Sequence, residues 1–325
     1  MNFIKLLVVS GEELLGVVTM DANILLYAVA DLDRAPIQLN NYSAAHEDNS
    51  TWSLDASGDW VVAGSNAWTI SCWNLATGEN RRSQVHSHNI PCVTCVAGTS
   101  LVLTASIDSS CRVSTLEGLE LAQAAPSHAW GWFVTSIPRQ SINLSARSFP
   151  GQFEYITTCV DQVRDASLLM KRRGAPAAEN QLQECGLLLY ATGRGLYLID
   201  PAVQSQRRMH VLCEYVPTVA SLIGGNGRIS LVEYVPEWGV CIFASQFKQF
   251  LCVVQLTKTP VEAAQQFVYF ISPVTDIRVS GRVLGLAVNN CVDQSNTVWV
   301  YVLTDNAEVV GFSLSKRDEL LALVL

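Results

Sequence analysis

The stretch from Ala67 to Leu75 reads Ala-Trp-Thr-Ile-Ser-Cys-Trp-Asn-Leu and is followed by Ala-Thr-Gly-Glu. Its β-branched and aromatic residues favour a β-strand, and the Thr-Gly that follows favours a turn. The stretch from Ser106 to Leu116 repeats this pattern, with Ser114 in the place that Trp73 holds 41 residues earlier. The run from Met20 to Tyr27 precedes both copies and ends on Tyr27 in the same place.

Three histidines stand just before apolar, strand-like runs at nearly the same period, namely His46, His88 and His128. A unit of about 40–45 residues with His near its start and a Trp-Asp pair near its end is the pattern of a WD40 repeat. Such a unit cannot bury both of its faces alone, and stacking units around an axis buries a continuous core. We therefore predict an all-β, WD40-like β-propeller of six or seven blades.

Later copies of the repeat are weaker but keep two strands around a short turn. The residues that occupy the Trp73 place are Tyr27, Trp73, Ser114, Ile199, Val254 and Phe312. The gap from Ser114 to Ile199 is about twice the period, so it holds either two blades or one blade with an insertion. Residues 139–184 contain a polar stretch, Lys171–Asn180, that includes Ala and Pro and shows no apolar alternation. We predict a single propeller over residues 1–325 with a loop insertion at 139–184.

The repeat also assigns structural residues to the blades. In a WD40 blade, the early His, the Asp of the inter-strand turn and the Trp near the end of the repeat form a buried hydrogen-bonded set. We expect His88 to pair with Asp108 in the third blade, where the Trp is missing. The structural residues predicted in this way are His46, Trp73, His88, Asp108 and His128.

Composition agrees with this fold and limits the partners. The chain is 49% hydrophobic and only 15% charged, which suits strands buried on both faces. Its net charge is −8, and the longest basic run is Lys171-Arg172-Arg173, so we expect no direct binding of nucleic acid. No apolar run approaches the ~20 residues that span a bilayer, and no secretory signal is visible. We expect a protein of the nucleus, the cytoplasm or both, with no membrane contact.

No motif for catalysis is recognisable in the sequence. The chain has neither a Gly-x-Ser-x-Gly elbow nor a phosphate-binding loop. Its five histidines lack metal-ligand spacing, and the Cys92-x-x-Cys95 pair has no second pair at zinc-finger distance. We read the ten cysteines as buried reduced thiols. The sequence predicts no enzyme, no catalytic residue, no metal, no cofactor and no small-molecule substrate.

Aromatic and arginine residues near turns are the better candidates for function, because such side chains anchor protein interfaces. Trp68 lies at a turn between two strands and either projects from the propeller rim or folds over the neighbouring blade. The arginines follow predicted strand ends, where they either bind acidic peptides or keep outer edges from pairing. The predicted partner-binding residues are Trp68, Trp132, Trp238, Arg81 and Arg207.

Several short sequence segments, taken in their order along the chain, resemble one fungal family. They are Asp48–Asp55, His86–Pro91, Trp130–Trp132, Arg228–Glu237, Ala244–Gln246 and Val283–Val288. From about residue 40 onward the chain resembles the "constitutive ribonucleotide reductase transcription" regulators, the tenth of that genetic series. The resemblance implies a WD-repeat, non-catalytic scaffold that acts with other proteins in nuclear control of ribonucleotide reductase genes and so in the DNA damage response. The alternative that it implies is a substrate receptor of a cullin-type ubiquitin ligase.

Overall fold

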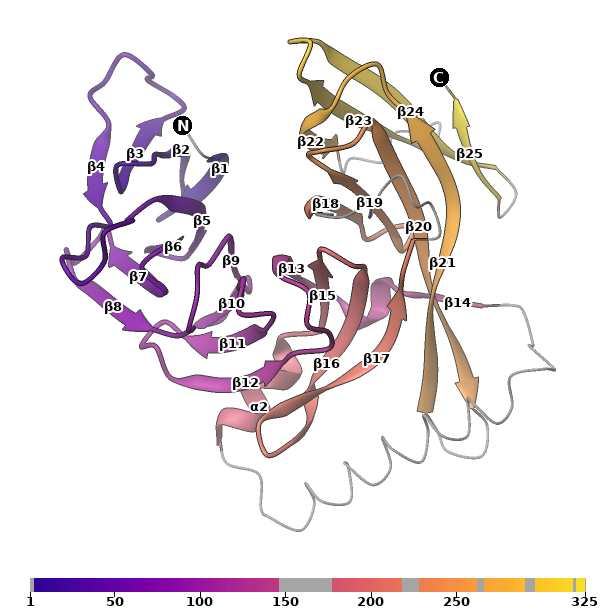
Figure 1. The fold of residues 1–325 in the computed structure, drawn as a ribbon, viewed down its shortest axis with the longest axis horizontal. Coiled ribbons are helices and arrows are strands. Elements are labelled where there is room, and N and C mark those ends of the chain that lie inside the picture. Colours follow the sequence, from indigo (N-terminus) through magenta and orange to yellow (C-terminus); the bar gives the residue numbers. More distant parts are fainter. Residues whose placement is uncertain are drawn as a thin grey trace. The chain divides into compact units, whose positions relative to one another are not determined.

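The structure is a computed structural model, of which residues 3–145, 177–217, 228–261, 266–289, 296–317 and 320–324 are described (Figure 1). Nearly every element in these ranges is a β-strand. The helical elements among them are the 3-10 helix η1 (Arg139–Ser141) and the helix α2 (Ala177–Glu184). Contacts divide the chain into two compact units, and the described residues of the first are 3–136, 177–190 and 199–211.

The first unit begins with two four-stranded antiparallel sheets and the strands of a third group, each built from consecutive strands. The first sheet holds β1 (Phe3–Val9), β2 (Glu12–Val18), β3 (Asn23–Ala28) and β4 (Ile37–Asn40). The second holds β5 (Thr51–Ser57), β6 (Trp60–Ser65), β7 (Thr69–Asn74) and β8 (Asn80–Gln84). The third group is β9 (Cys92–Cys95), β10 (Leu101–Ala105), β11 (Cys111–Thr115) and β12 (Glu120–Ala124).

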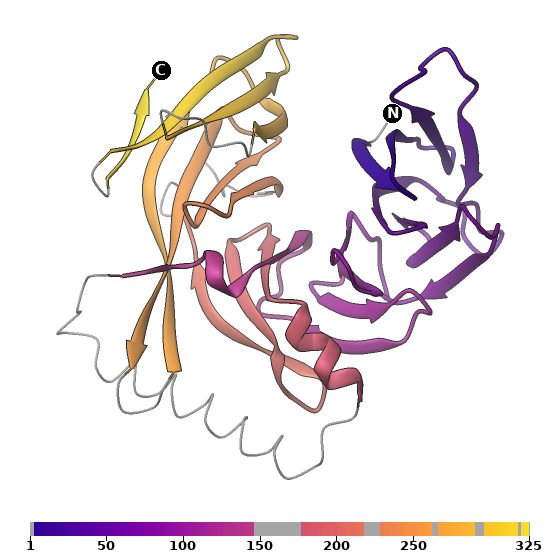
Figure 2. The ribbon, with the colours of Figure 1, turned by 180° about the vertical axis from the view of Figure 1, so that it is seen from behind.

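A fourth group of strands continues the sheet of β9–β12. Its members, in the order of the sheet, are β13 (Gly131–Ile137), β15 (Leu187–Thr192), β16 (Leu196–Ser205) and β17 (Arg208–Tyr215). One parallel bridge, from Gln123 of β12 to Arg208 of β17, joins the two groups. Seen from behind, α2 lies beside β12 and buries Leu182 (Figure 2).

The second unit holds two further groups of four strands. One is β18 (Ile229–Val235), β19 (Val240–Ser245), β20 (Phe250–Val261) and β21 (Gln266–Arg278), with β14 (Asn143–Leu144) parallel to β20. The other is β22 (Val283–Asn289), β23 (Thr297–Thr304), β24 (Val309–Arg317) and β25 (Leu320–Val324). Val240, Ile242 and Val253 of the first group pack with Val300 and Phe312 of the second in one apolar core.

The repeat read from the sequence matches this strand order. The residues aligned with Trp73 all fall on the third strand of a group, and they are Tyr27 on β3, Trp73 on β7, Ser114 on β11, Ile199 on β16, Val254 on β20 and Phe312 on β24. The described strands therefore form six four-stranded groups of the kind expected for blades. The predicted insertion at 139–184 includes residues 146–176, which lie outside the described ones, as does the run Lys171–Arg173. The insertion and the single domain over 1–325 stay predictions.

Inside the first unit, the first strands of consecutive groups lie next to one another. Nζ of Lys5 on β1 is 2.9 Å from Oδ1 of Asp55 on β5, and Oδ2 of Asp55 accepts a 2.8 Å hydrogen bond from the backbone N–H of Cys95 on β9. Asp55 is nearly buried, so both of its oxygens need such donors. This carboxylate thereby connects three blades at their first strands.

Candidate protein-interaction surface

Six loops and turns of the first unit form one continuous edge, which we call the turn edge. They connect the second strand of a group to the third, or the fourth strand to the next group. Their residues are 19–22, 41–50, 66–68, 85–91, 106–110 and 125–130.

Backbone hydrogen bonds run from each segment of the turn edge to the next. The N–H of Thr51 donates to the carbonyl of Thr19, and that of Asn66 donates to Ser50. The N–H groups of the later segments continue the series through the pairs Ile90 to Ser65, Ile107 to Asn89 and Gly131 to Ser106. These bonds pair backbone groups that would otherwise need water, and they hold neighbouring turns at fixed positions. The edge is thus a preorganised surface.

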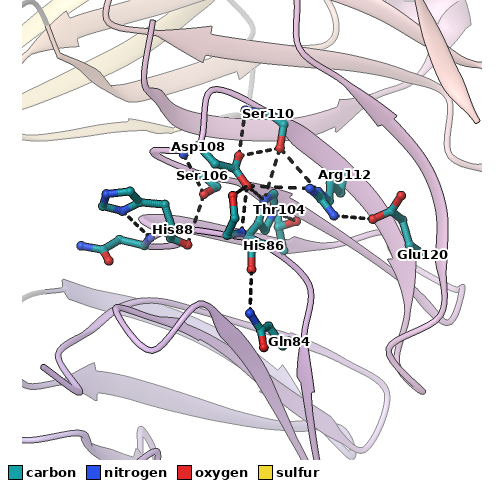
Figure 3. Close-up of polar contacts among 11 residues, drawn as sticks. Gln84, His86, His88, Thr104, Ser106, Asp108, Ser110, Arg112 and Glu120 are labelled. Carbon is teal, nitrogen blue, oxygen red and sulfur yellow. Dashed lines mark hydrogen bonds and ion pairs between the residues drawn. The ribbon is translucent and has the colours of Figure 1, made fainter. Parts of the chain in front are cut away.

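A buried polar network underlies the turn between β10 and β11 (Figure 3). Nδ1 of His86 lies 2.9 Å from Oδ2 of Asp108, and Nε2 of His86 lies 2.7 Å from the hydroxyl of Thr104. Oδ1 of Asp108 accepts hydrogen bonds from the N–H and the hydroxyl of Ser110, at 3.0 and 2.6 Å. Arg112 pairs with Glu120 and approaches Asp108 to 3.8 Å. The network therefore joins the loop before β9 to three strands of the third group, β10, β11 and β12.

The electrostatics of the His86–Asp108 pair favour a neutral histidine and a charged aspartate. Burial lowers the pKa of His86, and the bond to Asp108 offsets this only in part. Burial alone would raise the pKa of Asp108, but hydrogen bonds from His86, Ser110 and Ser87 outweigh it and hold that pKa well below its usual range. A neutral ring with its proton on Nδ1 donates to Asp108 and accepts from Thr104, which satisfies both ring nitrogens.

The structure corrects the predicted pairing of His88 with Asp108. His86 occupies that place, while the ring of His88 is exposed and its Nδ1 accepts the N–H of Asn89 (Figure 3). His128 is exposed as well, so the buried structural role predicted for it is wrong. His46 is half-buried against Trp68, and Trp73 is buried in the core of the first two groups.

Spacing alone missed His86 because both His86 and His88 fit the period to within two residues. Thr104 and Ser110, the other partners in the network, were not predicted either. The residue types that flank Asp108 carried a signal, since Ser and Thr next to a turn Asp are suited to bond it. Which histidine points inward depends on the path of the loop before β9.

Trp68 is the most informative residue of the turn edge. Its indole is half-exposed and lies between His46, with ring centroids 4.9 Å apart and edge-on, and His88, with centroids 6.4 Å apart. Its carbonyl accepts the N–H groups of Val85 and His86, each at 3.4 Å. The loop that carries the buried network thereby also fixes the backbone beneath the exposed indole. The sequence left two orientations open for Trp68, and in the structure its ring is half-exposed and packs against both imidazole rings.

The backbone at Trp68 is in the left-handed region, with φ 62°. The corresponding turns of other groups place Ala22, Ser109 and Ala307 there, with φ between 60° and 71°. Small residues tolerate this conformation better than a bulky aromatic residue, for which it is a true outlier. The left-handed turn thus recurs in four groups, and Trp68 is the bulkiest of the four residues placed in it.

Two further tryptophans follow on the same edge. Trp130 is 56% exposed, and its ring meets that of the half-buried Trp132 edge-on, with centroids 6.0 Å apart. The N–H of Gly131 between them donates to the carbonyl of Ser106 at 2.9 Å. Trp132, a predicted partner-binding residue, therefore supports the more exposed Trp130.

The predicted arginines lie away from the turn edge. Arg81 on β8 lies over the ring of Trp60, 4.8 Å from its centroid, and pairs with Glu79 at 2.6 Å and Glu117 at 3.1 Å. Its guanidinium is thus held within the protein. Arg207 is exposed in the tight turn between β16 and β17, where φ is 64°, and its carbonyl accepts the N–H of Gln123.

Trp238 does not fit the predicted partner-binding role. It is 3% exposed, belongs to the core of the second unit and donates from Nε1 to Oδ1 of Asn296 at 3.3 Å. A side chain covered on its apolar surface and bonded at its polar atom stabilises the fold and cannot reach a partner.

Two features of the described part of the chain bear on chemical activity, namely the placement of its potential metal ligands and the reactivity of its thiols. Within it, no three His, Cys, Asp or Glu side chains lie where they could share a metal ion. Burial raises the pKa of the Cys72 thiol to about 12, and it raises that of Cys92 as well, so neither is a ready nucleophile. No helix in the described ranges has the length and apolar character needed to cross a membrane.

Comparison with known proteins supports a repeat protein. No protein-family model matches the chain. A WD40 repeat-containing protein of Dictyostelium discoideum is 26% identical over 137 residues, which are 40% of this chain and 20% of that protein. The chain thus matches about a fifth of the length of this relative.

Among solved structures, the chain is similar to one in the crystal structure of the mitotic checkpoint complex. The TM-score is 0.60 at 8% identity, over 98% of this chain and 76% of the other. The fold is a WD40-like β-propeller.

Proposed function

We propose that this chain is a WD-repeat scaffold whose turn edge binds a partner protein. The observation that supports this is Trp68, a strained and half-exposed tryptophan held between two imidazole rings. Interfaces concentrate their binding energy in a few such aromatic anchors set in preformed surroundings. Trp130 adds a second exposed anchor to the same edge.

The setting that we propose for this scaffold is nuclear control of ribonucleotide reductase gene transcription. The support is the ordered set of segments that resemble the fungal regulators, and three of these segments fall wholly or partly on the turn edge. Asp48–Asp55 begins in the segment 41–50. His86–Pro91 forms the loop of the buried network, and Trp130–Trp132 carries the paired tryptophans. The competing proposal from the same resemblance is a substrate receptor of a cullin-type ubiquitin ligase.

Affinity purification of the tagged full chain from its native cells, followed by mass spectrometry, tests two parts of the proposal. One is the turn edge as the binding surface, and the other is the nuclear setting. Trp68→Ala and a matched variant, Trp299→Ala, are purified in parallel. Trp299 is an exposed tryptophan on β23 of the second unit, so it controls for the loss of a surface tryptophan outside the turn edge.

We expect partners that Trp68→Ala loses and Trp299→Ala keeps. Equal recovery with wild type and Trp68→Ala would remove the turn edge as the binding surface. Transcription regulators among the lost partners support the nuclear setting. Recovery of a cullin and its adaptor instead would replace that setting by the ligase proposal.

A further inference from the structure

The turn edge has a one-sided charge pattern. Its six segments contain no lysine and no arginine, whereas they contain the acidic residues Asp21, Glu47, Asp48 and Asp108. Asp108 is engaged by the buried network, but the side chains of Asp21, Glu47 and Asp48 are exposed. The guanidinium of Arg82 reaches this edge from β8 and is occupied there by the Tyr42 carbonyl. Arg82 keeps its positive charge, because a carbonyl is neutral, but the three exposed carboxylates outnumber it and the net charge at the edge is negative.

Two of the acidic residues, Glu47 and Asp48, lie in the segment whose His46 ring contacts the half-exposed indole of Trp68. Glu47 follows His46, whose ring contacts Trp68. Asp48 is connected to the same turn through Oδ2, which accepts a hydrogen bond from Nδ2 of Asn66 at 2.5 Å. A hydrogen bond from the N–H of Ser50 holds the pKa of Asp48 below its usual value, so this carboxylate keeps its charge.

A contact within the protein combines an indole and carboxylates around one guanidinium. On the outer strand β8, Arg81 lies over the indole of Trp60 with its guanidinium paired to Glu79 and Glu117. The turn edge presents the same two parts, an indole and nearby carboxylates, without an internal arginine. A guanidinium stacks on an aromatic face and at the same time bonds carboxylates, which a compact ammonium does less well.

We infer that the turn edge around Trp68 binds an arginine-bearing segment of a partner protein, with the guanidinium over the indole and Glu47 beside it. This rests on the proposed scaffold function and states the chemistry of its partner. Charge complementarity selects the segment, since the open carboxylates repel acidic peptides and would leave a neutral side chain without a counter-charge.

Fluorescence anisotropy on the purified full chain tests this inference. The probe is a labelled Gly/Ser peptide that carries several arginines, and the comparison probes replace every arginine by lysine, glutamine or glutamate. Titrations at low and at physiological ionic strength separate local contacts from attraction by net charge. We expect the arginine probe to bind tightest, the lysine probe less tightly, and the other two not at all.

Variants locate the site. Trp68→Ala should weaken binding of the arginine probe about fivefold to tenfold, while Trp299→Ala leaves it unchanged. The pair Asp21→Asn with Glu47→Gln should weaken it, whereas Glu12→Gln with Glu13→Gln, which removes the same charge from the start of strand β2, should not. Near-ultraviolet circular dichroism confirms that each variant stays folded.

The inference would be overturned if the two charge variants lost equal affinity for the arginine probe, or if Trp68→Ala left that affinity unchanged. Either result would indicate attraction by net charge. That result is distinct from failure of the scaffold function. Partners lost from Trp68→Ala in cells together with no preference for arginine in vitro would keep the surface and refute its stated ligand.

Discussion

His86 and Asp108 form a buried pair, with Nδ1 of the ring 2.9 Å from Oδ2 of the carboxylate. The pair links the loop before β9 to the turn between β10 and β11. Because the N–H of His86 also donates to the carbonyl of Trp68, the loop that holds the pair also holds the backbone of the exposed indole. Stability of the blade and geometry of the proposed binding surface are therefore coupled.

Removing the carboxylate tests the pair directly. Asp108→Ala leaves Nδ1 of the buried His86 and the hydroxyl of Ser110 without their acceptor. We expect a loss of about 1–3 kcal/mol in the free energy of unfolding, measured by urea denaturation. His88→Ala serves as the control, and its exposed ring should cost little. A larger loss in His88→Ala than in Asp108→Ala would contradict the assignment of His86.

The pair also predicts how stability depends on pH. The pKa of His86 in the folded state is lowered from 6.5, so the unfolded chain binds the proton first on acidification. Stability is then complete above about pH 6.5 and falls as the pH drops below it. The lowered pKa of Asp108 adds a second loss below its ordinary value of 3.8. Thermal melts between neutral pH and pH 5 measure the first step.

His86→Gln is the matched variant for this pH dependence. Glutamine keeps hydrogen-bonding capacity but does not titrate, so its melting temperature should change less between neutral pH and pH 5 than that of the wild type. An equal change in both proteins would assign the effect to other groups, of which His210 also has a lowered pKa through burial.

Backbone strain at Trp68 predicts that the glycine variant is more stable than the alanine variant, which is the reverse of the usual order. At φ 62° alanine is strained and glycine is not, so Trp68→Gly should be more stable than Trp68→Ala by about 1 kcal/mol. At Trp60, in the strand β6, the order should reverse, because glycine costs more chain entropy in a strand. Urea denaturation of the four variants gives both differences. The same order of glycine and alanine stabilities at both positions would refute backbone strain at Trp68.

The carboxylate of Asp55 is expected to matter more than its ion pair alone. Asp55→Ala removes an acceptor from both Lys5 and the backbone N–H of Cys95, and we expect it to cost about 1–3 kcal/mol of unfolding free energy. Lys5→Ala leaves the bond to Cys95 intact and should cost less than about 1 kcal/mol. Comparable losses in the two variants would show that the ion pair dominates.

Much of the architecture could be read from the chain. The positions aligned with Trp73 all lie on third strands, even where the residue is Ile199, Val254 or Phe312 instead of tryptophan. Apolar alternation and turn residues recur in every group, because each sheet has to be buried on its faces. Local pattern was sufficient for the repeat for this reason.

The tertiary structure was needed to choose between histidines or tryptophans that the sequence pattern could not distinguish. His86 and His88 differ by two residues, and only the path of the loop decides which ring meets Asp108. Trp238 and Trp68 both follow turns, yet the first is enclosed by the core of the second unit and the second stays half-exposed. Burial depends on residues distant in sequence, so no local pattern contains it.

The sequence by itself determined the repeat, the third-strand positions and the scarcity of charge, since these follow from alternation and composition. Tertiary structure alone decided which histidine is buried, which tryptophan is open and that six segments without lysine or arginine adjoin one another. The physical reason is that hydrogen bonds and packing between blades join residues tens of positions apart, and a strained, half-exposed Trp68 arises only where those contacts meet.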